Sequence, residues 1–563
     1  MDTLSSSFLQ IHSLSSPPPL PLIQSKAPTF KVKVKCKVNT SNSSINATSS
    51  KPPKTRQKTN QRSLLTNFFI SLDDFIINHI DPPLRPSIDP EILLSGNFAP
   101  VSELPPTACE VEEGTLPPCL DGAYIRNGPN PQFIPRGPYH LFDGDGMLHC
   151  IRISGGGTAA TFCSRFVETQ KYLVERETGS PVVINFLSAF TSFPASMARI
   201  AVWVGRAVSG QYDISRGNGL SNTSLACFGG NLFALAESDL PYRIKLTPDG
   251  DIITLGRHED YGEPLQQMTA HPKVDLETGI SSDGTKQPEV NIYSKNECSM
   301  VHDFAITKNY AIFPDPQIVI RPAEIIKGKQ PVLIDSTKVP RLGIIPRYAV
   351  DERDMWWVEV PGLNTMHMVN AWEEDGGATI VLVAPNLIPV ENVIEWPELT
   401  DMSMERIEIN VKTKTVTTRW TLSAIGMEFG VINPTYVGKK TRYMYAGIVG
   451  AGQKMSGVAK VDLSLSNQES HNCIVARRLY GPGCYGGEPC FVPREPDNEA
   501  AEEDDGYILN YVFNEHTQES KLLVMDAKSP NLDIVAVVKL PQRVPYGFHG
   551  MFVRECEIQK LGT

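Results

Sequence analysis

The sequence predicts an all-β protein of many short strands, and three observations carry that prediction. Proline (45 residues) and glycine (42 residues) are frequent and scattered along the 563-residue chain, as in proteins with many turns. From about residue 120 onward, short runs of strand-forming residues alternate with turn signals. No clean internal repeat is present, so the pattern fits a pair of sandwiches, a barrel or a propeller without selecting one.

The expected strands lie between recognisable turns, such as Asn127-Gly128-Pro129 and Asp375-Gly376-Gly377. We interpret Asp143-Gly144-Asp145-Gly146 as another β-turn, because a calcium-binding loop starting at Asp143 would have Ser154 rather than glutamate at its twelfth position. The clearest strand-like runs are residues 122–126, 147–153, 225–235, 379–383, 406–411 and 507–513.

Residues 1–62 differ in composition from the rest of the chain. They contain ten bases, one acid and twelve serines, whereas the whole chain has a net charge of −11. A basic, serine-rich and acid-poor N-terminus is typical of an organelle transit peptide, and a disordered basic tail is the alternative. We expect residues 1–62 to be such a peptide, cleaved between Cys36 and Ser63.

Two apolar segments are expected to be helical. Residues 64–79 carry apolar side chains at spacings of three and four, which predicts an amphipathic N-terminal helix within residues 63–90, ahead of a main domain over 91–563. Residues 182–208 are interrupted by Pro194, which predicts a pair of short helices. Each segment fits either packing on the main domain or contact with a membrane surface.

Composition and motif content exclude several classes of protein. The acidic net charge argues against a nucleic-acid partner. The eleven cysteines form no C-x-x-C pair, which fits reduced thiols better than a disulfide framework or a zinc site. The sequence contains no P-loop, no dinucleotide-binding fingerprint and no G-x-S-x-G motif.

Two sets of residues are candidates for a metal site. Metal-bound imidazoles usually donate their second N–H to a carboxylate, and a carboxylate in apolar surroundings is costly without such a partner. Spacing alone does not assemble either set, since unrelated core histidines and surface acids give the same pattern. Four histidines stand in short apolar or turn contexts, namely His271, His302, His367 and His549. Three glutamates stand in apolar or glycine-rich surroundings, namely Glu237, Glu428 and Glu488.

Many ordered motifs surround these residues between positions 65 and 560. They include YIRNGPNPQF (124–133), YHLFDGDGMLH (139–149), LAESDLPYRIKLTPDGDI (235–252), MTAHPK (268–273), HDFAITKNYAIF (302–313), NAWEEDG (370–376), VINPTYVG (431–438), YGPGCYGGEP (480–489) and LPQRVPYGFHG (540–550). Together they resemble the plant carotenoid cleavage dioxygenases, and most of all the type-4 branch of plastids.

The resemblance implies a seven-bladed β-propeller with a helical cap on one face. It implies one Fe(2+) per subunit, held by His271, His302, His367 and His549. It also implies that Glu237, Glu428 and Glu488 bond to three of those histidines. The implied location is the plastid, chloroplast or chromoplast, with residues 1–62 as its transit peptide. Peripheral contact with a plastid membrane or plastoglobule surface would use residues 64–79 and 182–208.

The implied activity is oxidative cleavage of a carotenoid double bond by O₂ to apocarotenoid aldehydes and ketones. We expect cleavage at 9,10(9′,10′), and cleavage at 7,8(7′,8′) is the alternative. One departure bears on this expectation. Only thirty residues separate His271 from His302, where the family has a longer, aromatic-rich segment. A short 274–301 segment predicts one incomplete blade, so a catalytically impaired carotenoid-binding propeller is the third interpretation.

Overall fold

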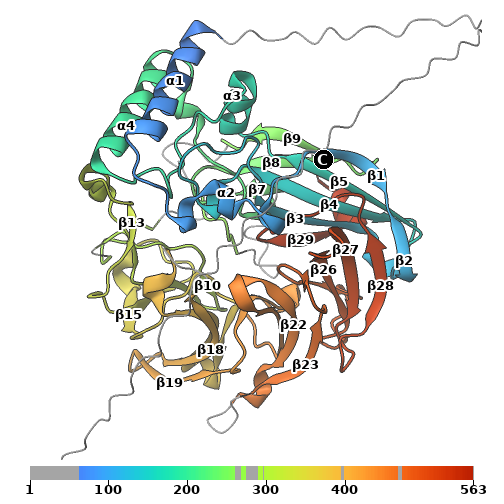
Figure 1. Cartoon of the computed structure of the whole chain (residues 1–563). Coiled ribbons are helices and arrows are strands. Elements are labelled where there is room, and N and C mark those ends of the chain that lie inside the picture. The colour runs from blue at the N-terminus through green and yellow to red at the C-terminus, as the bar shows by residue number, and fades with distance from the viewer. Residues whose placement is uncertain are drawn as a thin grey trace, which may run out of the picture. The chain divides into compact units, whose positions relative to one another are not determined.

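The structure is a computed structural model that describes residues 63–259, 268–273, 290–295, 297–394, 399–466 and 472–561. Residues Arg62–Thr563 form one compact unit, which is mostly β-sheet with few helices (Figure 1). The prediction of a mainly β protein is therefore confirmed. The expected transit peptide, residues 1–62, lies outside the described residues.

Six antiparallel sheets of four or more strands surround a common centre in the described part of the chain (Figure 1). The first sheet consists of β1 (Leu104–Ala108), β5 (Ala159–Phe166), β4 (Gly146–Ser154), β3 (Gly122–Pro129) and β29 (Gly550–Arg554). The second sheet consists of β6 (Ser224–Phe228), β7 (Asn231–Leu235), β8 (Tyr242–Leu246) and β9 (Ile252–Arg257). The third sheet consists of β10 (Ala305–Ile306), β11 (Tyr310–Asp315), β14 (Arg341–Pro346) and β15 (Trp356–Glu359).

The remaining sheets follow in chain order. The fourth consists of β16 (Asn370–Glu374), β17 (Thr379–Ile388), β18 (Asp401–Asn410) and β19 (Thr415–Thr421). The fifth consists of β20 (Met427–Val431), β21 (Tyr443–Val449), β22 (Met455–Asp462) and β23 (Ile474–Leu479). The sixth consists of β2 (Glu110–Gly114), β28 (Ile534–Lys539), β27 (Glu519–Asp526), β26 (Gly506–Asn514), β24 (Cys484–Tyr485) and β25 (Cys490–Pro493). A separate two-stranded sheet pairs β12 (Ile318–Ile320) with β13 (Val332–Ile334).

Segments from both ends of the described chain complete these sheets. β29 pairs with β3 in the first sheet, and β2 pairs with β28 in the sixth. The sheet near the start of the domain thus contains a late strand, and the sheet near its end contains an early one. None of the sheets in the described chain closes on itself into a barrel.

Each expected strand-like run coincides with strands except at Val411, which lies in the turn after β18, and one of the runs is a hairpin. Residues 225–235 form β6 and β7, joined at Gly229 and Gly230, because Phe228 pairs directly with Asn231. Both glycines have positive φ (54° and 66°), which a two-residue hairpin of this kind requires and which glycine adopts without steric cost.

Apolar cores lie between neighbouring sheets. Buried side chains of the first and second, third and fourth, fourth and fifth, fifth and sixth, and sixth and first sheets pack in shared clusters. The second and third sheets share no such cluster among the described residues. Residues 258–304, here called the β9–β10 junction, connect these two sheets. Residues 268 and 270 pack on the second sheet, whereas residues 290 and 304 pack on the third.

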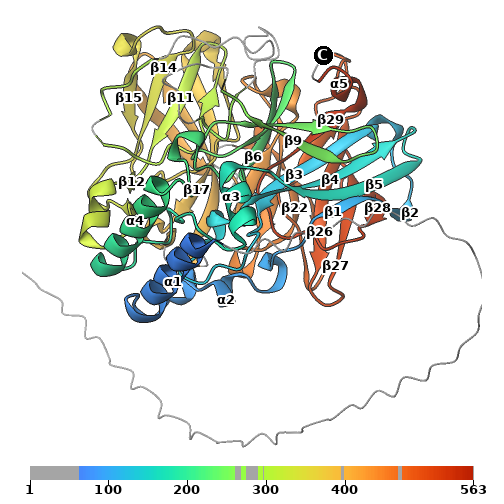
Figure 2. The same cartoon turned by 90° about the horizontal axis from the view of Figure 1, so that it is seen from above.

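Helices are few, and the two long ones lie side by side on one face of the ring of sheets (Figures 1 and 2). No helix of the described part is long and apolar enough to cross a membrane. The helices are α1 (Leu64–His79), α2 (Pro90–Leu93), α3 (Gln170–Thr178), α4 (Phe193–Val208) and α5 (Glu555–Ile558).

Helix α1 confirms the helix predicted over residues 64–79. The pair of helices predicted within residues 182–208 is wrong, because only α4 forms there, from Phe193 onward. Pro194 starts this helix instead of breaking one, and the Ser192 hydroxyl caps it by accepting from the N–H of Ala195. Upstream, the Ser188 hydroxyl donates to Asp143 and holds the segment in a turn.

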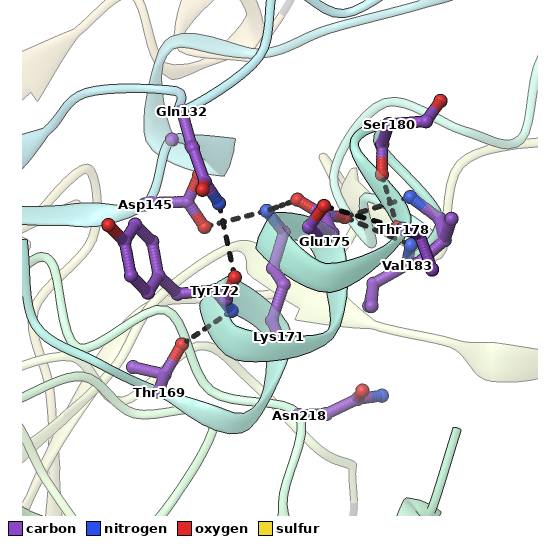
Figure 3. Close-up of polar contacts among 12 residues, drawn as sticks. Gln132, Asp145, Thr169, Lys171, Tyr172, Glu175, Thr178, Ser180, Val183 and Asn218 are labelled. Atoms are coloured by element: carbon purple, nitrogen blue, oxygen red, sulfur yellow. Dashed lines mark hydrogen bonds and ion pairs between the residues drawn. The ribbon is translucent and has the colours of Figure 1, made fainter. Parts of the chain in front are cut away.

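A buried ion-pair network attaches α3 to the sheets (Figure 3). Lys171 Nζ lies 2.7 Å from Asp145 Oδ1 and 2.7 Å from Glu175 Oε2, and all three side chains are buried. Glu175 Oε1 accepts from the backbone N–H groups of Val182 and Val183, so the network also holds the segment that leads into α4. Asp145, which the sequence placed in a plain β-turn, therefore anchors the helical cap.

Candidate metal centre

The structure brings His271, His302, His367 and His549 together. One ring nitrogen from each lies within 4.8 Å of the others, and all four residues are partly buried. His271 Nε2 and His302 Nε2 are 2.9 Å apart. The four rings come from different places, because His367 precedes β16, His549 precedes β29, and His271 and His302 lie in the β9–β10 junction.

Three of the four histidines have a carboxylate against Nδ1. His302 Nδ1 lies 2.5 Å from Glu237 Oε1, His367 Nδ1 lies 2.9 Å from Glu428 Oε1, and His549 Nδ1 lies 2.8 Å from Glu488 Oε1. Glu428 and Glu488 are placed to accept the Nδ1–H of His367 and His549 as hydrogen bonds, which leaves the Nε2 lone pair free to face the other rings. Glu237 and His302 are in close electrostatic contact. His271 has no such carboxylate in the described residues.

A β-bulge aims Glu428 at the centre. The pairing of β20 with β21 shifts register between Glu428 and Val431, and Phe429 has a positive φ of 53°. Such a backbone is unfavourable for a residue with a bulky side chain, and strained positions of this kind cluster at functional sites. The Phe429 ring lies 5.5 Å from that of His367 and 5.4 Å from that of His549, measured between ring centroids.

Phe429 is a site residue that the sequence reasoning missed. Its position directly after Glu428 and directly before Gly430 was the available signal, because glycine-flanked residues often mark a bulge. Its ring contacts two of the imidazoles.

Burial and the neighbouring charges shift the pKa values of the centre. Burial, together with the other three rings, lowers the pKa of His271 well below its ordinary value. Burial alone would lower the pKa of His367 too, but the Glu428 carboxylate outweighs it and raises that pKa. Burial alone would raise the pKa of Glu237, and its contact with His302 lowers it. His271 is thus held neutral, as a metal ligand must be.

The donor set fits a metal ion. His367 Nε2 is buried and has no hydrogen-bond partner among the described residues, which an ion at the centre would provide. Four imidazoles without a thiolate suit iron, zinc, copper or nickel. The chemistry of these donors therefore fits a metal site.

A hollow of about 100 Å³ lies apart from this centre. It is enclosed by α1, α4 and the segments around residues 135–138 and 181–185, and its lining includes Asp73, Trp203 and Arg206. None of its lining residues is one of the four histidines or the three glutamates. The hollow lies in the helical cap and is lined by other residues than those of the centre.

With this geometry established, comparison with known proteins identifies the family. The family profile described as retinal pigment epithelial membrane protein matches residues 98–554. An Arabidopsis thaliana protein named "Probable carotenoid cleavage dioxygenase 4, chloroplastic" is 52% identical over 534 residues, covering 91% of this chain and 88% of that protein. The chain belongs to the carotenoid cleavage dioxygenase family, whose members are non-haem iron dioxygenases that act on carotenoids with O₂.

Two further comparisons extend this result. A Crocus sativus protein named zeaxanthin 7,8(7′,8′)-cleavage dioxygenase, chromoplastic, is 48% identical over 368 residues, covering 62% of this chain and 99% of that protein. The crystal structure of Pseudomonas brassicacearum lignostilbene dioxygenase superposes with a TM-score of 0.69 at 21% identity, covering 83% of this chain and 98% of that one. At that identity the likeness concerns the fold. The family resemblance seen in the sequence motifs is thus confirmed.

Proposed function

We propose that this protein is an Fe(II)-dependent dioxygenase that cleaves a carotenoid at its 9,10(9′,10′) double bond. The observation that carries the reaction class is the convergence of four imidazoles, three of them backed by glutamates, in a chain of this family. The choice of bond rests on the sequence resemblance.

In this proposal His271, His302, His367 and His549 bind one Fe(2+) per subunit. Bound iron supplies the redox chemistry that lets O₂ react with an electron-rich double bond. Both oxygen atoms add to the two carbons of that bond, which splits into two carbonyl groups, so the reaction needs no external reductant.

The chain's own residues hold this centre. Glu237, Glu428 and Glu488 fix the Nδ1–H tautomer of three rings and raise their basicity. The apolar Phe429 ring contacts the rings of His367 and His549. The substrate would be positioned by the surrounding apolar wall, so regiospecificity is an effect of placement.

The sheet arrangement supports a seven-bladed β-propeller with a helical cap as the underlying frame. Six sheets would provide six blades, and the described residues of the β9–β10 junction, which connects the second and third sheets along the chain, would belong to a seventh, reduced blade. We propose the domain division of the sequence analysis, with a transit peptide over 1–62, an N-terminal helix within 63–90 and the propeller over 91–563.

Helices α1 and α4 form a surface suited to peripheral contact with a plastid membrane or plastoglobule. They pack on each other through Phe69, Ile76, Ala195 and Val202. Outside this contact they expose further apolar side chains, including Phe68 (56% exposed) and Val208 (84% exposed). Such surface is costly in water and is stabilised at a lipid interface. The plastid location is supported by the chloroplastic and chromoplastic relatives.

The membrane contact is tested with vesicles of galactolipid and phosphatidylglycerol. Phe68→Ser together with Val208→Ser should reduce binding by about 10-fold or more, because each buried apolar side chain contributes roughly 1.5–3 kcal/mol. Val350→Ser is the matched control, since Val350 is equally exposed (68%) but lies beside β14. Equal binding by the helix variant and the control would count against this surface.

Two other functions have a specific observation behind them. Cleavage at 7,8(7′,8′) is favoured by the 48% identity to a relative named for that reaction. A carotenoid-binding protein with impaired catalysis is favoured by the missing shared core at the β9–β10 junction.

Expression in carotenoid-accumulating cells, followed by product identification, separates these functions. Cleavage at 9,10(9′,10′) gives ionone-type ketones, and cleavage at 7,8(7′,8′) gives shorter cyclic aldehydes. Bound, uncleaved pigment indicates the binding protein. A His302→Ala chain is the control, and products that persist in it would contradict the proposed centre.

A further inference from the structure

Asp303 stands beside one of the four histidines and contacts the segments of two others. Its Oδ1 lies 2.7 Å from Lys273 Nζ, two residues after His271, and its Oδ2 accepts the N–H of Met368 at 2.8 Å, directly after His367. Asp303 Oδ1 also accepts the N–H of Phe304 at 2.7 Å. One carboxylate therefore connects three of the four histidine-bearing segments.

From this geometry we propose that Asp303, through its ion pair with Lys273, is a positioning residue that sets the place of His271 in the metal centre. The inference rests on the proposed function, because it assumes that the four histidines bind a metal. It adds a residue outside the imidazoles and the three glutamates.

The position of His271 depends on this ion pair more than the positions of the other three histidines do. Among the described residues His271 has no carboxylate at Nδ1, and no described strand adjoins it to fix its backbone. Its chain continues through Lys273 into residues 274–289, which lie outside the described residues. The Lys273 ammonium, held by Asp303, is the charged contact nearest to the ring along the chain, so it limits how far the His271 segment can move.

The burial of the Asp303–Lys273 ion pair makes their attraction strong. The contacts of this pair also explain why Asp303 is not itself a metal ligand. The Asp303 side chain is 3% exposed and that of Lys273 is 19% exposed, so water screens their attraction little. Both carboxylate oxygens are occupied by Lys273 and by backbone N–H groups. Asp303 is thus kept from becoming a fifth ligand, although it adjoins His302.

The test compares cobalt binding by four chains: wild type, Asp303→Asn, Lys273→Met and the double variant. Cobalt(II) reports both affinity and geometry, because its visible absorption depends on the arrangement of its ligands. Asp303→Asn should weaken cobalt affinity by about 10–100-fold, as losses of residues that orient metal ligands do, and should shift the visible bands at saturating cobalt.

The double variant distinguishes the loss of His271 positioning from a general loss of protein stability. Either single change leaves a charge buried without its partner, which lowers thermal stability, and removing both partners restores that stability. Cobalt affinity should stay low in the double variant, since the His271 segment is still untethered. Recovery of affinity together with stability would overturn the proposal, as would unchanged affinity in Asp303→Asn.

The Lys460–Asp504 ion pair provides a matched control. It is equally buried (6% and 11% exposed) with a 2.5 Å separation, and it joins the fifth and sixth sheets away from the histidines. Asp504→Asn should lower thermal stability and leave cobalt affinity and spectrum unchanged. An equal loss of affinity in this control would also overturn the proposal. A wild-type chain that binds neither cobalt nor iron overturns the proposed function itself.

Discussion

The two sides of the metal centre are built in different ways. His367 lies three residues before β16 and His549 directly before β29. Each of these strands is part of a sheet of at least four strands that shares cores with both neighbours. His271 and His302 lie in the β9–β10 junction, where the flanking sheets share no core among the described residues. One side is positioned by backbone ladders, and the other mainly by side-chain contacts.

The four histidines of the candidate centre are thus supported unequally by the surrounding sheets. On the junction side, the Thr269 hydroxyl accepts the His271 N–H and donates to the His302 carbonyl, and the Ser224 hydroxyl donates to the Ala270 carbonyl. These few contacts take over the role that strand pairing has for His367 and His549. We therefore expect the junction side to be more sensitive to the loss of single polar groups.

The largest expected effect is the loss of a ligand from the junction side. His302→Ala should abolish iron retention and cleavage while the fold persists, because no other described imidazole is placed to replace it. Iron content is measured by atomic absorption and the fold by circular dichroism. His516→Ala, at an exposed position, is the control. Stoichiometric iron in the His302 variant would show that the centre does not depend on this ligand.

Substituting the glutamates should weaken iron binding less than losing a histidine. The effect should differ between Glu428, which contacts His367, and Glu237, which contacts His302 of the β9–β10 junction. Glu428→Gln should weaken iron affinity or turnover by about 10–100-fold. Glu237→Gln should have a weaker effect, since the side chain of Glu237 is 35% exposed and that of Glu428 only 5%, so solvent screens its charge more. Iron titration of both variants checks this order. Equal losses of iron affinity in the two variants would mean that burial of the glutamate does not determine the strength of its contact with histidine.

The smallest expected effect comes from one neutral hydroxyl. Thr269→Val removes the acceptor of the His271 N–H and the donor to the His302 carbonyl, which should cost about 1 kcal/mol, or roughly five-fold in metal affinity. Thr247→Val, which removes a similar local bond in the loop before β9, is the control. If the two variants bind metal equally well, the junction side is held by something other than these contacts.

Sequence alone predicted the strand content, the helix over residues 64–79 and the family, because strand periodicity, helical spacing and ordered motifs are local signals. It also singled out the four histidines and three glutamates, although only the family resemblance grouped them. Their positions 31 to 182 residues apart carry no information about contact until the sheets are arranged in space. Their role as iron ligands remains our proposal.

The features that escaped prediction depend on contacts between distant segments. The turn at Ser188, where a helix was expected, depends on a contact with Asp143, which lies 45 residues earlier in the chain. The start of α4 beside Pro194, by contrast, was encoded locally by the Ser192 cap, and that signal was misread. Asp145 looked like a turn residue, because its partner Lys171 lies on another element. Phe429 and Asp303 acquire their roles only when β20 and the β9–β10 junction meet the other histidine segments.

The pairing of β29 with β3 has a consequence for how the protein is made. His549 immediately precedes β29, and β29 completes a sheet whose other strands are synthesised several hundred residues earlier. A nascent chain still lacking this region has three of the four histidines and an unfinished first sheet. In the proposed centre, full metal loading would therefore follow translation of the C-terminal region, and a firmly held ion would mark a polypeptide whose synthesis has passed that point.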